Sequence, residues 1–325
     1  MRIVTASMAL LIAIFQLSPV SASGADFPTK PVRFLVAFPP GGIVDVMARI
    51  LSPHLTELWG QQTVVDNRGG ANGIIGTEVL AKSTPDGYTM LMGTLTSHAI
   101  NASLYKKLPY DTVKDFTFVT LVGSVTNVLV VVPSVPIHSV RDLIKMAKAK
   151  PNSLSFASFG TGSSAHLAGE LFKSLAKVEM THIPYKGGPL AITGMLSGEA
   201  HLMFSSVPPA LPHLKAGKLR AVAVTGAKRS RDFPQLPTIS EEGLKGFDVN
   251  SWYAVIAPKG LPKGILDKLN TDLVSVINLP EVRKKLEANG VEVATSSPQG
   301  AAEVLEKELV LWAKVIKISN TRIDQ

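Results

Sequence analysis

Residues 31–59 read PVRFLVAFPPGGIVDVMARILSPHLTELW, and the hydrophobic pattern changes its period halfway through this stretch. Residues 32–38 form an apolar run rich in β-formers, which predicts a buried strand. The PPGG sequence at 39–42 ends that strand, and from residue 44 to residue 59 apolar side chains recur at helical spacing. A buried strand, a glycine turn and an amphipathic helix in this order are typical of an α/β layer.

The same alternation continues outward along the chain. Further strands are predicted at 63–65, 89–92, 154–158, 180–185, 200–204, 220–224, 252–257 and 291–294, with two more β-rich runs at 116–122 and 127–132. Helices are predicted at 74–82, 139–150, 165–176, 190–197, 264–277, 281–289 and 299–318, and polar loops at 93–101 and 205–209. The helix at 139 opens with a capping-box-like SVRD sequence. Strands that alternate with helices predict an α/β fold with a largely parallel sheet.

Two β-rich crossings, near 120–130 and 245–255, divide this pattern into two lobes. We predict a first lobe of residues 26–124 and 250–325, and a second lobe of residues 125–249. The chain then crosses twice between the lobes, and the C-terminal helices return to the first lobe. The roughly 300 residues after the first 25 are a usual length for two domains.

Residues 1–25 are predicted to be a cleavable export signal. Arg2 supplies a positive charge, and residues 8–17 (MALLIAIFQL) form a short apolar run. Small residues at 20–22 (VSA) or 23–25 (SGA) offer two alternative cleavage sites. The alternative, a membrane anchor, needs about 20 apolar residues, and the run is shorter than that.

Composition excludes several classes of function. The formal charge of +8 becomes +7 without Arg2, and the basic residues do not form the stripe that a nucleic-acid partner requires. The chain has no cysteine, which rules out disulfides, thiolate zinc sites and cysteine nucleophiles. Its 7 histidines show no HExxH-like spacing, so we expect neither a metal site nor a cofactor.

Three glycine loops share one topological place, after a strand and before a helix. They are at 41–42, 160–164 and 187–188. Ligands of open α/β sheets bind at this edge, where glycines allow close approach and helix N-termini offer free N–H groups. Such a place suits a carboxylate without any arginine. For each loop taken alone, a simple tight turn is an equally good interpretation.

Two enzymatic or cofactor alternatives fit less well. Residues 160–165 match the GxGxxA dinucleotide fingerprint, but Glu179, the acid at the expected spacing, begins its strand instead of ending it. A hydrolase would need a GxSxG elbow, which is absent. His166 follows Ser163 and Ser164 closely, and we expect it to serve in packing or capping. No catalytic residue is predicted.

Ordered motifs over residues 28–318 resemble one known family. The motifs are PVRFLVAFPPGGIVDVMAR at 31–49, VDNRGGANGIIGT at 65–77, PDGY at 85–88, GTGSSAHL at 160–167, PYKGG at 184–188, LPHLKAGKLR at 211–220, LPTISE at 236–241, Trp252, and AP at 257–258. Each is weak alone, but together they resemble the solute receptors of tripartite tricarboxylate transporters, also called the Bug family.

The resemblance implies a type II periplasmic-binding-protein-like fold of two α/β lobes, each a mostly parallel sheet flanked by helices, that closes on a small organic acid. With the loop analysis, it gives the candidate ligand-binding residues Phe38, Gly41, Gly42, Ile43, Asp45, Thr94, Ser97, Thr161, Gly162, Ser163, Ser164, Tyr185, Gly187 and Ser205. Ser205 and Ser206 stand where family members often have an aspartate. The identity of the acid therefore does not follow from the resemblance.

Two candidates have two interpretations each. Asp45 lies in the first turn of its helix, where a carboxylate favours the helix dipole and can accept from free amides; alternatively, it accepts a hydrogen bond from the ligand. Phe38 is either a core residue or an apolar wall of the cleft.

The resemblance implies a monomeric periplasmic receptor that passes its ligand to a large and a small membrane subunit of a transporter. A receptor that docks on a sensor kinase and an exported enzyme are the alternatives. We further predict that backbone amides near residues 41–43 and 161–164 hold the carboxylate, helped by the hydroxyls of Thr161 and Ser163. On that basis, Gly42→Val is expected to be more harmful than Ser163→Ala, because a valine blocks approach to the backbone and would need a dihedral that only glycine adopts readily.

Overall fold

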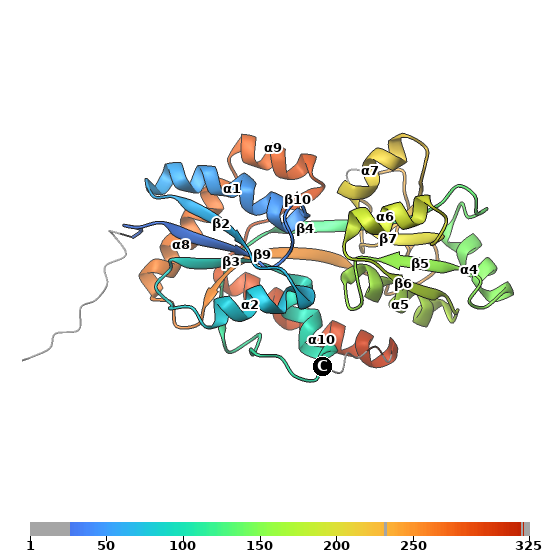
Figure 1. Cartoon of the computed structure of the whole chain (residues 1–325), viewed down its shortest axis with the longest axis horizontal. Helices are drawn as coiled ribbons and strands as arrows, with labels where there is room; N and C mark the ends of the chain where they lie inside the picture. The colour runs from blue at the N-terminus through green and yellow to red at the C-terminus, as the bar shows by residue number, and fades with distance from the viewer. Residues whose placement is uncertain (1–26, 231–232, 320, 322–325) are drawn as a thin grey trace, which may run out of the picture.

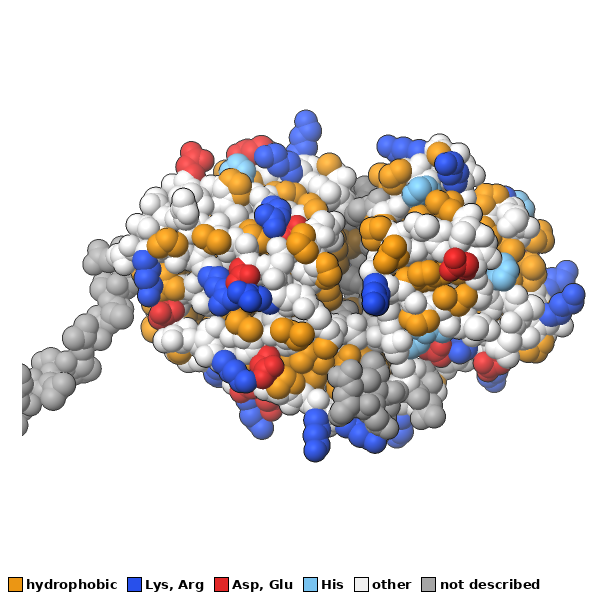
Figure 2. Space-filling model, viewed as in Figure 1, with side chains coloured by type: hydrophobic (Ala, Val, Ile, Leu, Met, Phe, Trp, Pro, Cys, Tyr) orange, Lys and Arg blue, Asp and Glu red, His pale blue; other side chains and the backbone are white. Residues whose placement is uncertain are grey.

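The computed structural model describes residues 27–230, 233–319 and 321, and shows two lobes joined by long strands (Figure 1). A groove separates the lobes in the space-filling view (Figure 2). The predicted export signal lies outside the described residues. Within the described ranges, no helix is both long and apolar enough to cross a membrane.

The first lobe is built on three parallel strands in the order β2-β1-β3. Their bounds are Val32–Val36 for β1, Thr63–Asn67 for β2 and Thr89–Thr94 for β3. Helices α1 (Ile43–Trp59), α8 (Lys263–Ile277) and α9 (Pro280–Ala288) pack together around one apolar core, and α2 (Ile74–Ala81) contributes to another. The short β10 (Val291–Val293) pairs antiparallel with β4 (Phe116–Val131).

The second lobe repeats the design with the parallel strands β5 (Ser155–Ser158), β6 (Thr181–Pro184) and β7 (Leu202–Ser206). Strand β8 (Arg220–Val224) pairs antiparallel with β4, which also pairs with β7. The helices are α4 (Val140–Ala149), α5 (Ser164–Ala176), α6 (Gly188–Leu196) and α7 (Val207–Lys215). The predicted cap of α4 is confirmed, because Ser139 Oγ accepts a hydrogen bond from Asp142 N at 3.1 Å.

Two long strands cross between the lobes, as the β-rich crossings predicted (Figure 1). Strands β4 (Phe116–Val131) and β9 (Asn250–Pro258) pair antiparallel with each other. The last helix, α10 (Pro298–Ser319), contacts both α3 (Asn101–Leu104) of the first lobe and α5 of the second. The residue limits predicted for the lobes stay a prediction.

Three local predictions are wrong. The β-rich runs at 116–122 and 127–132 form one strand, β4, because the polar residues between them lie in the crossing. The predicted loop at 93–101 contains a π-helical turn, η3 (Thr96–Ile100), and α3 (Asn101–Leu104). The predicted loop at 205–209 ends β7 and begins α7, which has proline in its first turn, where proline is tolerated, and a further one, Pro212, inside the helix.

Candidate functional site

The directions of the strands bring two loop-rich edges face to face. Strand β4 runs from the first lobe into the second, and β7 is antiparallel to it, so β5–β7 run toward the first lobe. Strand β9 is antiparallel to both β4 and β3, so β1–β3 run toward the second lobe. The carboxyl ends of both parallel sets therefore face the groove, which is where ligands bind in open α/β sheets (Figures 1 and 2).

The loop between β1 and α1, residues 38–42, is held by a charged network around Asp45. The buried Asp45 carboxylate accepts hydrogen bonds from Gly41 N (2.9 Å), Arg49 Nε (2.9 and 3.0 Å) and Asn67 Nδ2 (3.0 Å). Asn67 Nδ2 also donates to the carbonyl of Phe38 at 3.2 Å. Burial alone would raise the pKa of Asp45, but the hydrogen bonds from Arg49, Gly41 and Asn67 hold it below its usual value. Asp45 thus stays ionised and fixes the loop.

This first-lobe loop leaves amides exposed toward the groove. Among the described residues, the N–H groups of Gly42 and Ile43 have no hydrogen-bond partner. Gly42 has an ordinary φ of −78°, and an added Cβ would meet nothing nearer than the Pro39 carbonyl at 3.7 Å. The dihedral reason given for harm in Gly42→Val is therefore wrong, since this position accepts a side chain. The partial positive charge of the α1 N-terminus remains available to an anion.

Phe38 is half-buried and lies over a neighbouring glycine turn. A Cβ on Gly73 would be 3.1 Å from the Phe38 ring and 3.3 Å from Ser97 Cβ, so the absence of one lets these residues meet. Thr94 and Ser97 are buried and bond to each other, with 3.1 Å between their hydroxyls. The Ser97 hydroxyl also lies 2.9 Å from Nδ1 of His98, a fully buried imidazole. Phe38 therefore borders both core and groove, whereas Thr94 and Ser97 face inward.

The second-lobe loop, residues 159–163, satisfies most of its own polar groups. Ser163 Oγ donates to the Gly160 carbonyl at 2.7 Å and accepts from His166 N at 3.3 Å, so it caps α5. Ser163 N donates to the same carbonyl at 3.1 Å. In the part of the chain that the structure describes, the N–H groups of Thr161 and Ser164 remain without a partner. The hydroxyl of Ser163 is thus already occupied.

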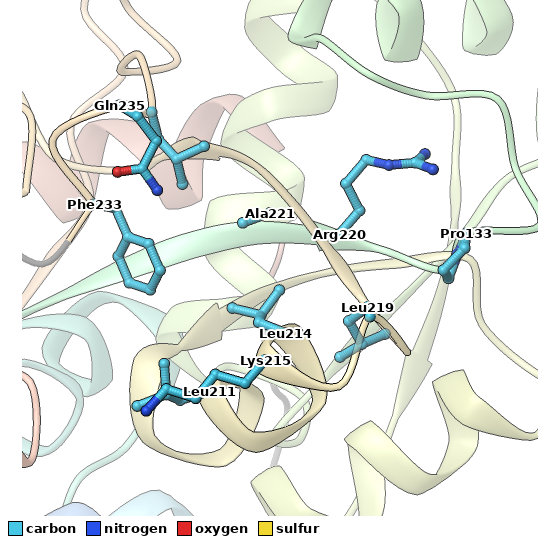
Figure 3. A pocket seen from close by; sticks show the side chains of 11 residues that line it. Pro133, Leu211, Leu214, Lys215, Leu219, Arg220, Ala221, Phe233 and Gln235 are labelled. Atoms are coloured by element: carbon cyan, nitrogen blue, oxygen red, sulfur yellow. The ribbon is translucent and has the colours of Figure 1, made fainter.

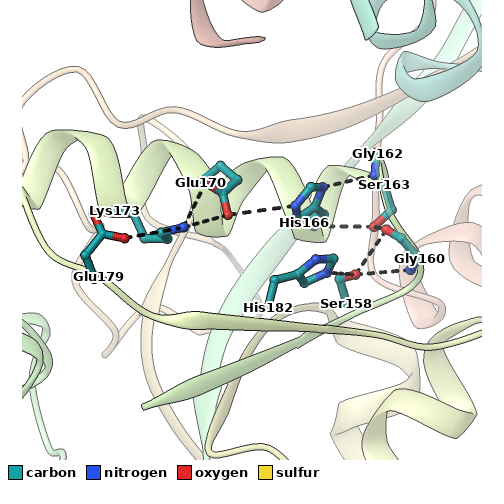
Figure 4. Close-up of polar contacts among 9 residues, drawn as sticks. All are labelled: Ser158, Gly160, Gly162, Ser163, His166, Glu170, Lys173, Glu179 and His182. Carbon is teal, nitrogen blue, oxygen red and sulfur yellow. Dashed lines mark hydrogen bonds and ion pairs between the residues drawn. The ribbon is translucent and has the colours of Figure 1, made fainter. Parts of the chain in front are cut away.

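A stacked pair of histidines lies beside this loop (Figure 4). The rings of His166 and His182 are 3.9 Å apart, and His166 Nδ1 accepts the Gly162 N–H at 3.0 Å. His182 Nε2 lies 2.7 Å from the hydroxyl of Ser158. Burial, the neighbouring ring and Lys173 lower the pKa of His166 to about 3, and burial and Lys173 lower that of His182 to about 4. Both rings are neutral at physiological pH, and the packing expected of His166 is observed.

Asn72 and Leu104 of the first lobe both contact this loop. Asn72 Nδ2 of the first lobe donates to the Thr161 carbonyl at 2.8 Å and to Tyr105 Oη at 3.0 Å. Gly162 lies against Leu104, leaving no room for a Cβ. Sequence analysis missed Asn72, although an asparagine among glycines is a signal for the left-handed conformation that it adopts (φ 54°).

The remaining predicted residues have polar groups that are engaged within the second lobe, or supply a turn. The Tyr185 hydroxyl donates to Glu199 at 2.8 Å, and burial together with that carboxylate raises the pKa of Tyr185 to about 12. Gly187 caps α6 with a φ of 109° and has open space around it. Ser205 is fully buried in β7, and its hydroxyl donates to the Ser206 carbonyl.

A separate depression of about 600 Å³ lies in the second lobe between α7 and β8 (Figure 3). Its lining includes Leu211, Leu214, Arg220 and Phe233, and none of the predicted site residues. No cluster of three or more potential metal ligands occurs within the described ranges.

Two α/β lobes with facing carboxyl edges and exposed amides define the class of two-lobed solute-binding receptors. The chain belongs to the tripartite tricarboxylate transporter family receptors (TctC), whose family model matches residues 47–321. This is a family of receptors and not of enzymes, so both the family resemblance and the expectation of a non-catalytic protein are confirmed.

Solved structures of similar proteins confirm the fold class. The chain is 39% identical to Rpa4515 of R. palustris, solved with adipate, over 90% of this chain and 98% of that one, with a TM-score of 0.84. It is 32% identical to the periplasmic binding protein BugD, over 92% and 100%, with a TM-score of 0.82. It is 29% identical to MatC of Rhodopseudomonas palustris, solved with malate, over 89% and 100%, with a TM-score of 0.81.

Proposed function

We propose that this protein is a periplasmic receptor that binds a small organic carboxylate in the groove between its lobes. The observation that carries the proposal is the likeness to the adipate-bound receptor across 90% of the chain. The malate-bound relative and the exposed amides at the α1 and α5 N-termini agree with it. Adipate and malate both carry two carboxylates, so a dicarboxylate is the first ligand to test.

The candidate residues divide into two groups under this proposal. We place Phe38, Gly42, Ile43, Thr161 and Ser164 nearest the ligand, because their amides or side chains face the groove or have free N–H groups. The other candidates act mainly by shaping these loops, since their polar groups are engaged internally or they supply turns: Gly41, Asp45, Thr94, Ser97, Gly162, Ser163, Tyr185, Gly187 and Ser205.

Delivery to a transporter with a large and a small membrane subunit is the finer part of the proposal. It rests on the family to which the chain belongs. The predicted export signal and the periplasmic relative BugD support a periplasmic location. We expect a monomer. A sensor kinase is the alternative partner, and uptake of the acid by vesicles that contain the two membrane subunits, with and without this receptor, separates the two.

Native mass spectrometry of gently purified protein, followed by calorimetry with adipate, malate and uncharged adipamide, tests ligand binding. We expect an intact acid to bind, unaffected by EDTA, and adipamide not to bind. Failure of both the co-purified acid and the two diacids to bind would contradict the proposal, as would turnover of the ligand.

The contribution of the first-lobe amides can be isolated at one position. Gly42→Pro removes the N–H while matching the local φ of −78°, and Gly42→Ala keeps the N–H as the matched control. We expect the proline variant to bind about 10-fold or more weakly, because a hydrogen bond to a charged group is lost. Equal affinities for the two variants would show that this amide does not contact the ligand.

A further inference from the structure

The peptide unit between Thr161 and Gly162 is bonded at both ends to different lobes. Its carbonyl accepts from Asn72 Nδ2 of the first lobe at 2.8 Å. Its N–H donates to His166 Nδ1 within the second lobe at 3.0 Å. The missing side chain of Gly162 lets Leu104 of the first lobe pack against it. We call these two hydrogen bonds and this packing the interlobe latch.

The first-lobe end of the latch is held in a strained conformation. Ala71 and Asn72 both have positive φ angles, 47° and 54°, between glycines that also have positive φ. Asn101 Nδ2 donates to the Asn72 backbone carbonyl at 3.1 Å, and the side-chain Nδ2 of Asn72 donates to Tyr105 Oη at 3.0 Å. Two successive non-glycine residues in the left-handed region are costly and persist only where their surroundings fix them. Here they direct the Asn72 side chain at the other lobe.

The second-lobe end is fixed by the histidine stack (Figure 4). His166 is buried between Gly162 and the ring of His182, and Phe156 packs against both imidazoles, with its ring centroid 4.9 Å from that of His182 and 6.3 Å from that of His166. Glu170, one turn along α5, lies 3.8 Å from His166 Nε2, which orients the ring with Nδ1 toward the loop. A neutral imidazole in this orientation accepts the Gly162 N–H and turns the Thr161 carbonyl outward, toward the first lobe.

We propose that Asn72 and His166 are positioning residues that hold the Thr161–Gly162 peptide as the interlobe latch, and that retention of the ligand in the closed groove depends on it. The inference rests on the proposed function. Neither side chain needs to touch the ligand, because the latch acts by stabilising the arrangement in which the lobes face each other closely. A binding-competent state that is less populated weakens the apparent affinity in proportion.

The first experiment changes one atom of the latch. Asn72→Asp keeps the size of the side chain and tolerates positive φ, but replaces the donor to the Thr161 carbonyl with an acceptor. With adipate as the probe, stopped-flow fluorescence should show an off-rate about three- to tenfold faster and an on-rate changed less than about twofold. An unchanged off-rate would overturn the latch.

The second experiment uses rescue at His166. His166→Leu removes the acceptor of the Gly162 N–H, whereas His166→Asn can place an acceptor oxygen near the position of Nδ1. The leucine variant should release adipate about three- to tenfold faster, and the asparagine variant should restore most of the wild-type off-rate. If His166 had a purely structural role, the off-rates of the two variants would follow their thermal stabilities. The asparagine variant would then restore the off-rate only as far as it restores the stability.

A third measurement separates this inference from the proposed function. Small-angle scattering of wild type and Asn72→Asp, without and with adipate, reports lobe separation directly. We expect a larger radius of gyration for Asn72→Asp in at least the adipate-free protein, and equal radii in both conditions would overturn the latch. Absence of adipate binding by the wild type would count against the proposed function, and the scattering comparison would still decide on the latch.

Discussion

The loops at residues 38–42 and 159–163 occupy equivalent places in the two lobes but are held by opposite chemistry. The first-lobe loop is fixed by an ionised carboxylate, Asp45, in contact with an exposed arginine. The second-lobe loop is fixed by two neutral, stacked imidazoles. The first loop keeps its terminal amides free, whereas the second satisfies most of its groups and contacts the other lobe.

This difference separates two tasks that sequence alone assigns to both loops. A charged support at the rim suits a loop that must remain open to water and to an anion. An uncharged, buried support suits a loop that meets the opposite lobe, because a charge there would have to be desolvated at the contact. Under the proposed function, ligand capture then falls mainly to the first loop and closure mainly to the second.

The largest expected difference in the free energy of unfolding is between substitutions at Gly162 and at Gly42. Gly162→Ala forces a side chain into a φ of 80° and against Leu104, so the free energy of unfolding should fall by about 2–4 kcal/mol. Gly42→Ala, with its φ of −78° and open surroundings, should change it by less than about 0.5 kcal/mol. Urea unfolding of both variants measures the difference, and similar losses would remove the contrast between the loops.

The carboxylate support of the first loop gives the next largest effect. Asp45→Ala leaves the Gly41 and Asn67 donors without their buried acceptor, and should lower the free energy of unfolding by about 2 kcal/mol. Arg49→Ala is the control, and its cost should stay below about 1 kcal/mol, because more than half of the Arg49 side chain is exposed to solvent. Chemical denaturation at pH 7 compares them; an arginine variant as unstable as the aspartate variant would contradict this account.

As the pH falls, the contribution of His166 in the second loop to the free energy of unfolding should be lost before that of Asp45 in the first loop. The pKa of His166 is lowered in the folded protein to about 3, so its contribution to stability is present above the unfolded pKa of about 6.5 and is lost as the pH falls below it. The pKa of Asp45 is also lowered, so its contribution persists until the pH falls below about 4. At pH 5.5, His166 should account for about 1.4 kcal/mol of lost stability.

Unfolding curves of wild type and His166→Asn from pH 7 to pH 5 measure this loss, because the asparagine does not titrate. The two proteins should converge in stability as the pH falls. Parallel curves over that range would show that His166 is not held neutral by folding.

The smallest effect separates the two hydroxyls of the second loop. Ser163→Ala removes the cap of α5 and should lower the free energy of unfolding by about 1 kcal/mol, with ligand affinity changed less than about threefold. Thr161→Ala removes an exposed hydroxyl and should leave stability within about 0.5 kcal/mol of wild type. Calorimetry and thermal denaturation of both variants would reveal a reversal, in which Ser163 governs affinity and not stability.

Most of the fold could be predicted because it follows from local patterns. The change from apolar run to helical period at residues 32–59, and its repetition along the chain, fix the α/β class and place most elements within a few residues. The continuity of β4 could not be predicted, because its middle (GSVTN at 123–127) lacks the apolar character of a buried strand. Those residues cross between the lobes, where Ser124 and Thr126 are only partly buried, and Asn127 is buried although it is polar.

The position of the candidate site could be predicted from the sequence, but the roles of its individual residues could not. Glycine loops after strands indicated where ligands bind, yet whether an N–H or hydroxyl is free depends on partners far along the chain. Gly162 is matched to Asn72 and Leu104, and Asp45 to Asn67, by tertiary contacts that no local spacing encodes. Asn72 carried the one available signal, its place within NRGGANG, which points to backbone geometry and not to its partner.

The paired strands β4 and β9 connect the lobes as a two-stranded ribbon, which resists sliding and bending to different degrees. Its register shifts between Phe118 and Thr120, and again between Leu121 and Gly123. Sliding one strand past the other would break the whole ladder of hydrogen bonds, whereas bending at the irregular steps breaks few of them. The ribbon therefore resists sliding of one strand past the other and permits bending. Bending of this ribbon in the proposed closure would bring residue 161 back to the same position beside Asn72 each time.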